Sequence, residues 1–273
     1  MSDPLSITAS VVGITVAALH GTRRLLEDLQ QLKDAPKTVK RLVEEVHSVN
    51  TALTLVQDVE DREWELLGAD LAELLRTTIF NCKQACDLFR TDLQRWTRHS
   101  EDGKLAWKDR ANVGFFKQAQ IKAMSEQLSN YRLTITSAVS IVTLYISVRH
   151  SHITEEIKKT ISTTQAEVKS AITTADKKLV ILESKLDDIN LSDDDGAAGF
   201  IEGKSETLRQ LEGELKAAKV SQKLLNSLLS KSQEEAVAKA AVPSTTVTFG
   251  DQNSGLQAGT INGGVNGISF GGK

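Results

Sequence analysis

The sequence predicts an all-α fold: a helical bundle with a coiled-coil-like extension, followed by a glycine-rich tail. Three observations lead to this class. Only 3 of the 273 residues are proline, and a proline inside a helix costs roughly 3 kcal/mol. Apolar residues recur at steps of three and four over most of the chain, which is the helical period. Eight of the 17 glycines lie in residues 244–273, so the helical character ends near residue 242.

The first predicted helix begins at Pro4, because the first helical position needs no N–H. Residues 4–22 carry no formal charge when His20 is neutral, and Arg23 and Arg24 close the run. A helix of that length spans about 28 Å, close to the apolar thickness of a bilayer. Its apolar residues cover nearly the whole circumference, and the candidates for membrane contact are Leu5, Ile7, Val11, Val12, Ile14, Val16 and Leu19.

Two interpretations of this helix remain open. Hydroxyl residues and Gly13 weaken it as a permanent span, so we expect a buried helix of the bundle in the resting protein. The alternative is conditional: the helix is masked at rest and enters a membrane once it is released. A signal peptide is not expected, because Asp3 stands where such a peptide carries positive charge.

Three helical patterns complete the predicted bundle. One starts at Pro36 and runs to Val56, a second runs from Leu67 to Trp96 and includes Leu88, and a third runs from about Ala111 to Ile146. The end of the third, residues 133–148, has no charge and is rich in β-branched residues. We interpret it as a central buried helix rather than a strand, because the helical period runs into it.

A heptad pattern follows from Ile153 to Ile189 and predicts a narrow seam for one partner helix. A last helix is expected over residues 205–241. The predicted organisation is therefore a helical bundle with its extension at 1–190, an acidic linker at 191–204, a helix at 205–242 and a tail at 243–273.

No catalytic, cofactor or metal site is expected. The sequence contains no glycine loop for phosphate, no His-Glu-x-x-His and no nucleophile elbow. Cys82 and Cys86 lie one helical turn apart and are interpreted as small core residues rather than as metal ligands. Asp193, Asp195, Gly196 and Glu202 fit part of a calcium loop, but Leu191 occupies its first ligand position, which favours an acidic linker. The net charge of −3 does not favour binding to nucleic acid.

The tail carries the most specific pattern, a near-palindrome around Gln257. Apolar residues alternate with polar residues or glycine, and charges are almost absent. Stacked in register, Asn and Gln side chains form ladders at about 4.8 Å spacing while apolar faces interlock. The alternative is a flexible linker. The predicted amyloid core consists of Asn253, Gly255, Leu256, Gln257, Ala258, Gly259, Ile261 and Asn262.

These residues resemble the pseudo-palindromic amyloid motif of fungal cell-death proteins, which is similar to the RIP homotypic interaction motif of animals. Leu256-Gln257-Ala258-Gly259 matches the apolar-Gln-apolar-Gly core of that motif. Residues 1–190 resemble a HeLo-like domain, with an uncharged leading helix before a helical bundle. The combination is most similar to the HELLP type of fungal cell-death proteins.

The resemblance implies a function in programmed cell death, as in heterokaryon incompatibility and fungal innate immunity. It implies a tail that is disordered in the monomer and cross-β in amyloid. A NACHT- or NB-ARC-type (NLR-type) receptor with a matching amino-terminal motif would template the tail. The leading helix would then move from the cytoplasm to the plasma membrane and permeabilise its lipids. A second class of function remains open, in which the protein is a helical coiled-coil adaptor that scaffolds signalling complexes without membrane activity.

Overall fold

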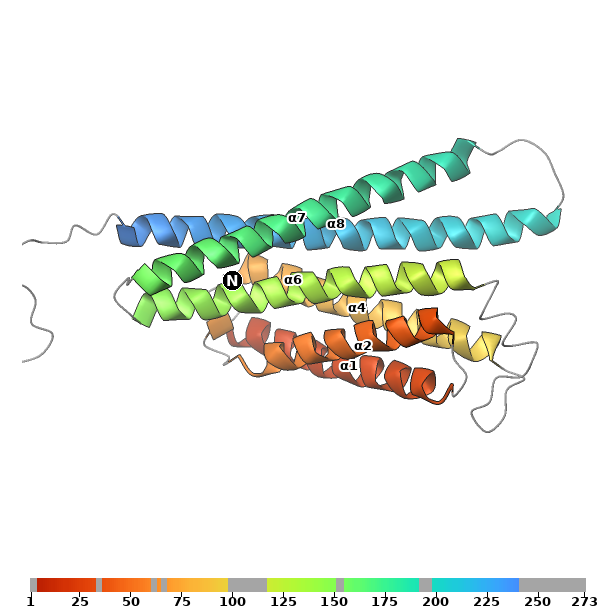
Figure 1. The fold of residues 1–273 in the computed structure, drawn as a ribbon, viewed down its shortest axis with the longest axis horizontal. Helices are drawn as coiled ribbons and strands as arrows, with labels where there is room; N and C mark the ends of the chain where they lie inside the picture. Colours follow the sequence, from red (N-terminus) through yellow and green to blue (C-terminus); the bar gives the residue numbers. More distant parts are fainter. Residues whose placement is uncertain are drawn as a thin grey trace, which may run out of the picture.

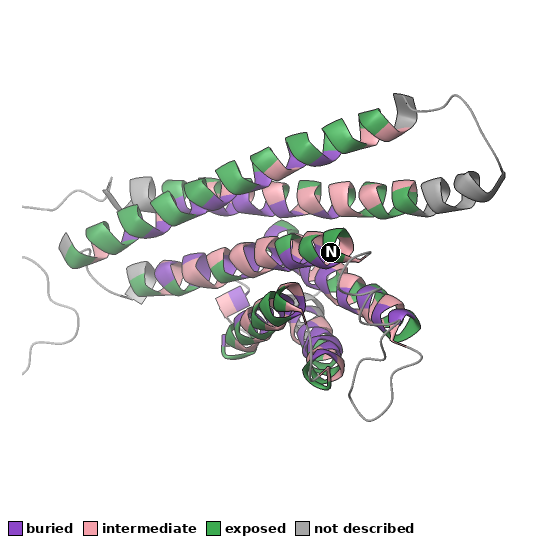
Figure 2. Ribbon diagram, turned by 45° about the vertical axis from the view of Figure 1, so that its right-hand side comes forward, coloured by how far each residue is buried: buried purple, intermediate pink, exposed green. Residues whose placement is uncertain are grey.

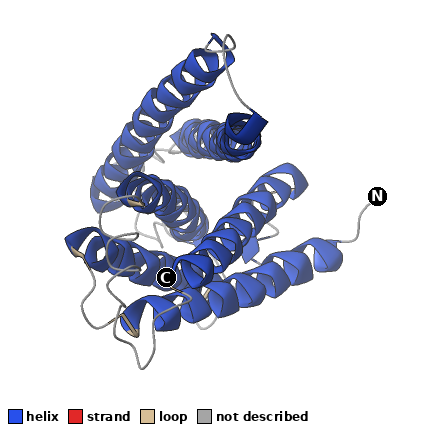
Figure 3. Ribbon diagram, turned by 90° about the vertical axis from the view of Figure 1, so that its right-hand side faces the viewer, coloured by secondary structure: helices blue, strands red, loops and turns tan. Residues whose placement is uncertain are grey.

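The computed structural model describes residues 4–32, 36–59, 63–64, 68–97, 117–150, 155–191 and 198–240. Its long helices are α1 (Pro4–Gln30), α2 (Lys37–Gln57), α4 (Ala69–Trp96), α6 (Gln118–His150), α7 (Glu155–Leu191) and α8 (Ala198–Ala240). No strand occurs in the described part of the chain (Figure 3). The predicted all-α class is confirmed for these residues.

The helices are arranged in layers. Figure 1 shows α1 and α2 along one side of the molecule and α7 and α8 along the opposite side, with α4 and α6 between them. α1 packs against α4 and α2, and α2 packs against α6. α8 packs against α7, α6 and α4. α1 therefore lies at the outside of the bundle and touches neither α7 nor α8 extensively.

Local signals set two of the helix starts. Pro36 precedes α2, and its carbonyl oxygen accepts hydrogen bonds from the N–H groups of Val39 and Lys40 at 3.0 and 3.1 Å. Gly68 precedes α4 with φ of 84°, a conformation that a side chain makes costly. The chain therefore needs a glycine to enter α4 in this direction.

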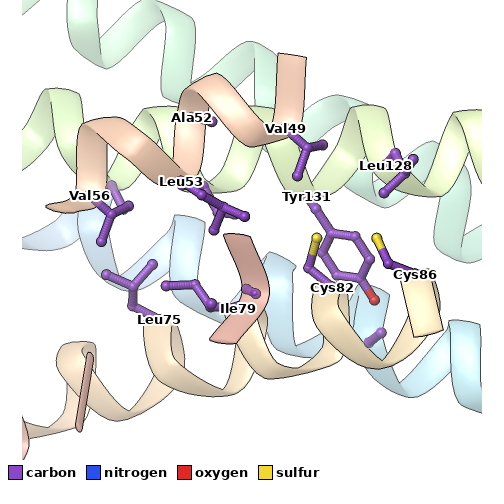
Figure 4. Close-up of a cluster of buried hydrophobic side chains, with 14 of the residues drawn as sticks. Val49, Ala52, Leu53, Val56, Leu75, Ile79, Cys82, Cys86, Leu128 and Tyr131 are labelled. Carbon is purple, nitrogen blue, oxygen red and sulfur yellow. The ribbon is translucent and has the colours of Figure 1, made fainter. Parts of the chain in front are cut away.

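The centre of the core lies where α2, α4 and α6 meet (Figure 4). Leu53 and Ile79 are fully buried there, and Tyr131 reaches in from α6. Cys82 and Cys86 are free thiols with no exposed area, on either side of the Tyr131 ring in Figure 4. The interpretation of both cysteines as small core residues is confirmed.

The uncharged end of α6 is helical, as predicted. Ile135, Ala138, Ile141 and Val142 are buried, which matches a central helix rather than a strand. The helix begins at Gln118 in the structure, and the expected start near Ala111 lies outside the described residues.

The heptad prediction is confirmed along α7, where Ile161, Val168, Leu179 and Leu182 are buried. The prediction of a single partner was too narrow, because α7 packs against α6 as well as α8. Figure 1 shows α7 diverging from α8 towards Leu191. α8 begins at Ala198, inside the range assigned to the linker, and it packs on the bundle itself.

Leu88 was wrongly included in the buried pattern of α4, since its exposed fraction is 62%. Its neighbour Phe89 and the earlier Cys86 are buried. Residues two apart on a helix point about 200° apart, so Leu88 faces away from the side that Cys86 presents to the core.

Candidate functional site

The candidate membrane helix is longer than its uncharged run. α1 continues from Pro4 to Gln30, so Arg23 and Arg24 do not end it. Both arginines are exposed, while Leu25 and Leu29 beyond them are buried. The charges face solvent and the apolar period continues, which explains why the helix extends past them.

One face of α1 is closed against the bundle. Its buried residues repeat at three and four positions: Val11, Thr15, Ala18, Leu19, Thr22, Leu25 and Leu29. The Thr15 hydroxyl donates a hydrogen bond of 2.7 Å to the carbonyl oxygen of Val11. The buried hydroxyl therefore carries no unmet hydrogen bond, which would otherwise cost about 1–3 kcal/mol.

The predicted membrane residues do not share one environment. Val11 and Leu19 are buried, Val12 and Ile14 are half-buried, and Val16 is 51% exposed. The expected buried helix of the bundle is therefore buried along one face and exposed along another. A solvent-facing stripe on α1 contains Gly13, Val16, His20, Arg23, Arg24 and Glu27. Figure 2 shows in green the exposed faces of the helices. Leu5 and Ile7 belong to α1, but their side chains lie outside the described residues.

Apolar burial holds α1 in place. Fully burying a Val or Leu side chain contributes about 1.5–3 kcal/mol. Val11, Leu19, Leu25 and Leu29 are each at most 3% exposed, so together they contribute on the order of 10 kcal/mol as an upper estimate. Any movement of this face into lipid has to replace contacts of that magnitude.

The approach of α1 to α4 is close at Gly21. A Cβ atom at this position would lie 3.3 Å from Asp87 Oδ1 and 3.6 Å from Lys83 Cγ. That spacing is tighter than ordinary van der Waals contact, so a larger residue would displace the neighbouring side chains. The absence of a side chain at Gly21 thus sets the spacing between the two helices.

A polar clamp joins the end of α1 to α4. Arg90 Nε donates to Asp28 Oδ2 at 2.8 Å, and Gln94 Nε2 donates to the same oxygen at 3.2 Å. The Asp28 and Arg90 side chains are only 23% and 30% exposed. An ion pair of this kind contributes about 1 kcal/mol or less, so the clamp orients α1 more than it stabilises it.

A second polar contact joins α1 to α2. Thr22 Oγ1 lies 3.1 Å from Asn50 Oδ1 and 3.1 Å from the Leu19 carbonyl oxygen. The hydroxyl has one proton, so it donates to one of these oxygens at a time. Thr22 is buried, and this contact fixes the register between the two helices.

Sequence reasoning missed the clamp and the lower half of the buried face. Asp28 and Arg90 are 62 residues apart, and no pattern in a single sequence pairs them. Leu25 and Leu29 continue the helical period of the first helix. They could have been found by extending that period past Arg23 instead of stopping at the first charge.

The described residues contain no helix that is long and apolar enough to cross a membrane. Within the same residues, no three His, Cys, Asp or Glu side chains are grouped as a metal site would need.

The predicted amyloid residues lie outside the described part of the chain, as do most of the partial calcium-loop residues. The prediction for Asn253, Gly255, Leu256, Gln257, Ala258, Gly259, Ile261 and Asn262 therefore stays a prediction.

Comparison with known proteins places the helical part in a family. Residues 2–212 match the family described as "Pigment biosynthesis cluster protein PigL N-terminal". The match begins before α1 and ends within α8. No curated protein and no solved structure gives a significant match. The family is fungal and related to HeLo-like domains, which supports the broader part of the resemblance but not the HELLP type or an amyloid motif. Because the match covers most of the helical region, the chain belongs to the PigL_N family.

Proposed function

We propose that this protein executes cell death. Its tail is templated into amyloid by an NLR-type receptor, and the helical part then targets and permeabilises the plasma membrane through α1. The protein is cytoplasmic at rest in this proposal, and it acts without catalysis or a cofactor. The relation of the PigL_N family to HeLo-like domains supports the proposal.

The single observation that carries the proposal is the position of α1. A segment without formal charge forms the first part of an outer helix that packs mainly on α4 and α2 among the described helices. Its exposed stripe already presents Val16 to solvent. The helix can therefore leave the bundle without taking α6, α7 or α8 apart.

Amyloid assembly supplies the driving force for release. The buried face of α1 contributes on the order of 10 kcal/mol as an upper estimate. Insertion of the uncharged run into lipid lets one isolated chain regain only the share of that run, to which Val11 and Leu19 belong. Tethering many chains on one fibril can raise their binding to a membrane by a factor of about 10² to 10⁴. Assembly thus shifts the balance from the docked helix to the inserted helix.

The test places a charge on α1 where it leaves the fold intact. A charge at Val11 would be buried and would destabilise the bundle, so loss of activity there would be ambiguous. Val16→Asp lies on the exposed stripe and should change the unfolding free energy by no more than about 0.5 kcal/mol. An Asp near the centre of an inserted helix costs about 2.5–3.5 kcal/mol, which weakens insertion about 70- to 400-fold.

The matched control is Leu88→Asp, because Leu88 is also an exposed apolar residue but lies on α4. Each variant is expressed in cells that also receive preformed fibrils of the wild-type protein, which act as seeds in place of the receptor. Cell death and localisation of the variant at the membrane are then scored. We expect Val16→Asp to abolish both and Leu88→Asp to retain both. Full activity of Val16→Asp would refute membrane action through α1.

The amyloid step has its own test in the full-length chain. Gln257→Pro and Gly259→Pro each remove a ladder hydrogen bond and fix φ, so we expect neither variant to be seeded by wild-type fibrils. Thioflavin fluorescence and fibre diffraction report the assembly, with an expected reflection near 4.8 Å. Efficient seeding of either proline variant would contradict the amyloid proposal.

An adaptor function is the second candidate, and one observation favours it. Val180 and Ile181 on α7 are 66% and 54% exposed, although Leu179 and Leu182 beside them are buried. An exposed apolar pair on a heptad helix is a typical contact for a partner helix. If Val180→Asp with Ile181→Asp abolishes signalling while Val16→Asp leaves it intact, the adaptor function replaces the effector function.

A further inference from the structure

The hairpin of α1 and α2 carries a set of exposed cations, which we call the basic patch: Arg23, Arg24, Lys37, Lys40 and Arg41. All five are exposed. None has an ion-pair partner within the part of the chain that the structure describes. The patch is unusual in a chain whose net charge is −3.

The patch is concentrated at one end of the hairpin. Gln30 ends α1 and Lys37 begins α2, so the cations on each helix lie within roughly 10 Å of the connection at 1.5 Å per residue. α1 and α2 lie side by side at the edge of the molecule in Figure 1. Salt screens exposed charges over about 8–10 Å under physiological conditions, so cations gathered at one end of the hairpin reinforce one another at a nearby charged surface.

Acidic side chains do not cancel the patch. Asp28 is engaged by Arg90 at 2.8 Å, and Glu45 lies 3.9 Å from Arg132 on α6. Only Glu27 and Glu44 are exposed acids on these two helices. On α1 and α2, the five exposed cations of the basic patch therefore outnumber the two exposed carboxylates, so the exposed side of the hairpin carries net positive charge.

An apolar residue adjoins the patch on α1. Val16 is 51% exposed, and Arg23 follows it by seven residues, which is two turns along the same face. Val12, half-buried, lies one turn before Val16. A stripe that passes from apolar to basic fits a membrane surface, where the apolar part meets the acyl boundary and the cations meet headgroups. A nucleic acid would use the charge but not the apolar part.

We propose that the basic patch docks the folded, unassembled protein weakly and reversibly on an anionic lipid surface, in exchange with the cytoplasmic resting protein, before α1 is released. The inference rests on the proposed function, because it assigns a lipid class to the same helix. Docking would position α1 at the membrane with its exposed stripe towards the lipid, so that release and insertion follow over a short distance.

The test uses the purified full-length chain without fibril seeds. Cosedimentation is measured with vesicles of phosphatidylcholine alone and with vesicles that also contain phosphatidylserine. The test variant carries Lys37→Gln, Lys40→Gln and Arg41→Gln, all on α2 and all exposed. The matched control carries Lys159→Gln, Lys169→Gln and Lys223→Gln, which remove the same charge from exposed positions on α7 and α8.

Each cation near an anionic surface strengthens binding about fivefold. We therefore expect the test variant to bind anionic vesicles about a hundredfold more weakly than wild type, and the control to bind within a few-fold of it. Wild-type binding should also disappear in about 1 M salt, where the Debye length falls to about 3 Å. The salt measurement needs no variant, so the proposal stays testable even if a variant misfolds.

Three results would overturn the inference. The first is equal binding by the test variant and the control, and the second is wild-type binding to neutral vesicles as tight as to anionic ones. The third is binding to a DNA duplex that is tighter than binding to anionic vesicles, which would assign the patch to nucleic acid. Failure of the proposed function gives a different pattern. The wild-type protein still docks on anionic vesicles, but after seeding the wild-type protein and Val16→Asp cause equal leakage of the vesicles.

Discussion

Leu25→Ala provides a direct way to loosen α1 without altering the part that is proposed to insert. Leu25 has no exposed area on the face that α1 presents to the bundle. It lies three residues beyond the uncharged run of residues 4–22. Removing a fully buried leucine side chain costs about 2–5 kcal/mol. Even the low end of that range raises the fraction of molecules in which α1 is detached from the bundle by about 30-fold.

Amide hydrogen exchange measures how often α1 detaches in Leu25→Ala, and vesicle leakage measures whether the detached helix acts on a membrane. We expect α1 amides to exchange at least 30-fold faster in Leu25→Ala, while amides in α7 and α8 change little, because α1 makes its contacts with α2 and α4. Leakage of anionic vesicles without seeds should rise by a similar factor. The matched control is Leu88→Ala, the same substitution at a position that is 62% exposed, where the change should stay within about 0.5 kcal/mol.

Two results would refute this reasoning. If exchange accelerates equally in all helices, α1 opens only by global unfolding and cannot be released on its own. If α1 exchanges faster but unseeded leakage stays at the wild-type level, the docked position of α1 is not what restrains membrane activity.

Three further predictions concern the polar and thiol groups of the bundle. Asp28→Asn should lower the unfolding free energy by about 0.5–1 kcal/mol, and a double-mutant cycle with Arg90→Gln should show that most of this loss is coupling between the two side chains. Burial raises the pKa of Glu214 despite the nearby Lys178, so folding favours the protonated carboxyl. The contribution of Glu214 to the unfolding free energy is largest below the usual pKa of glutamate, and it is lost as the pH rises through the raised pKa. Chemical denaturation should therefore show that the stability of Glu214→Gln increases relative to wild type from acid to neutral pH. The hydrogen bond with Cys86 and burial raise the pKa of Cys82, so the native protein should resist iodoacetamide and react only at the rate of unfolding.

Periodicity predicted the helices well because it reports which residues must be covered. The uncharged end of α6 is β-branched, yet the continuing three- and four-residue steps correctly indicated a helix, and Ile135 and Ile141 are buried as that period requires. The seam of α7 was found in the same way, with Val168 and Leu182 buried.

The errors arose where a single rule was applied alone. Treating Arg23 as the end of the first helix ignored that a charge on the exposed side interrupts nothing. Including Leu88 in the core counted an apolar residue without checking its direction on the helix. The number of partners of α7 and the clamp between Asp28 and Arg90 depend on how helices far apart in sequence meet. Local periods carry no information about that.

Gly21 has a genetic consequence. Apart from a stop codon, every single-base change that replaces the encoded glycine introduces a residue with a Cβ atom. At this position the added atom meets the side chain of Asp87 at 3.3 Å. Alanine requires Asp87 to shift by a few tenths of an ångström, whereas a branched or longer residue wedges α1 away from α4. Inherited variation at this codon would therefore produce alleles with a looser first helix far more often than alleles with a tighter one.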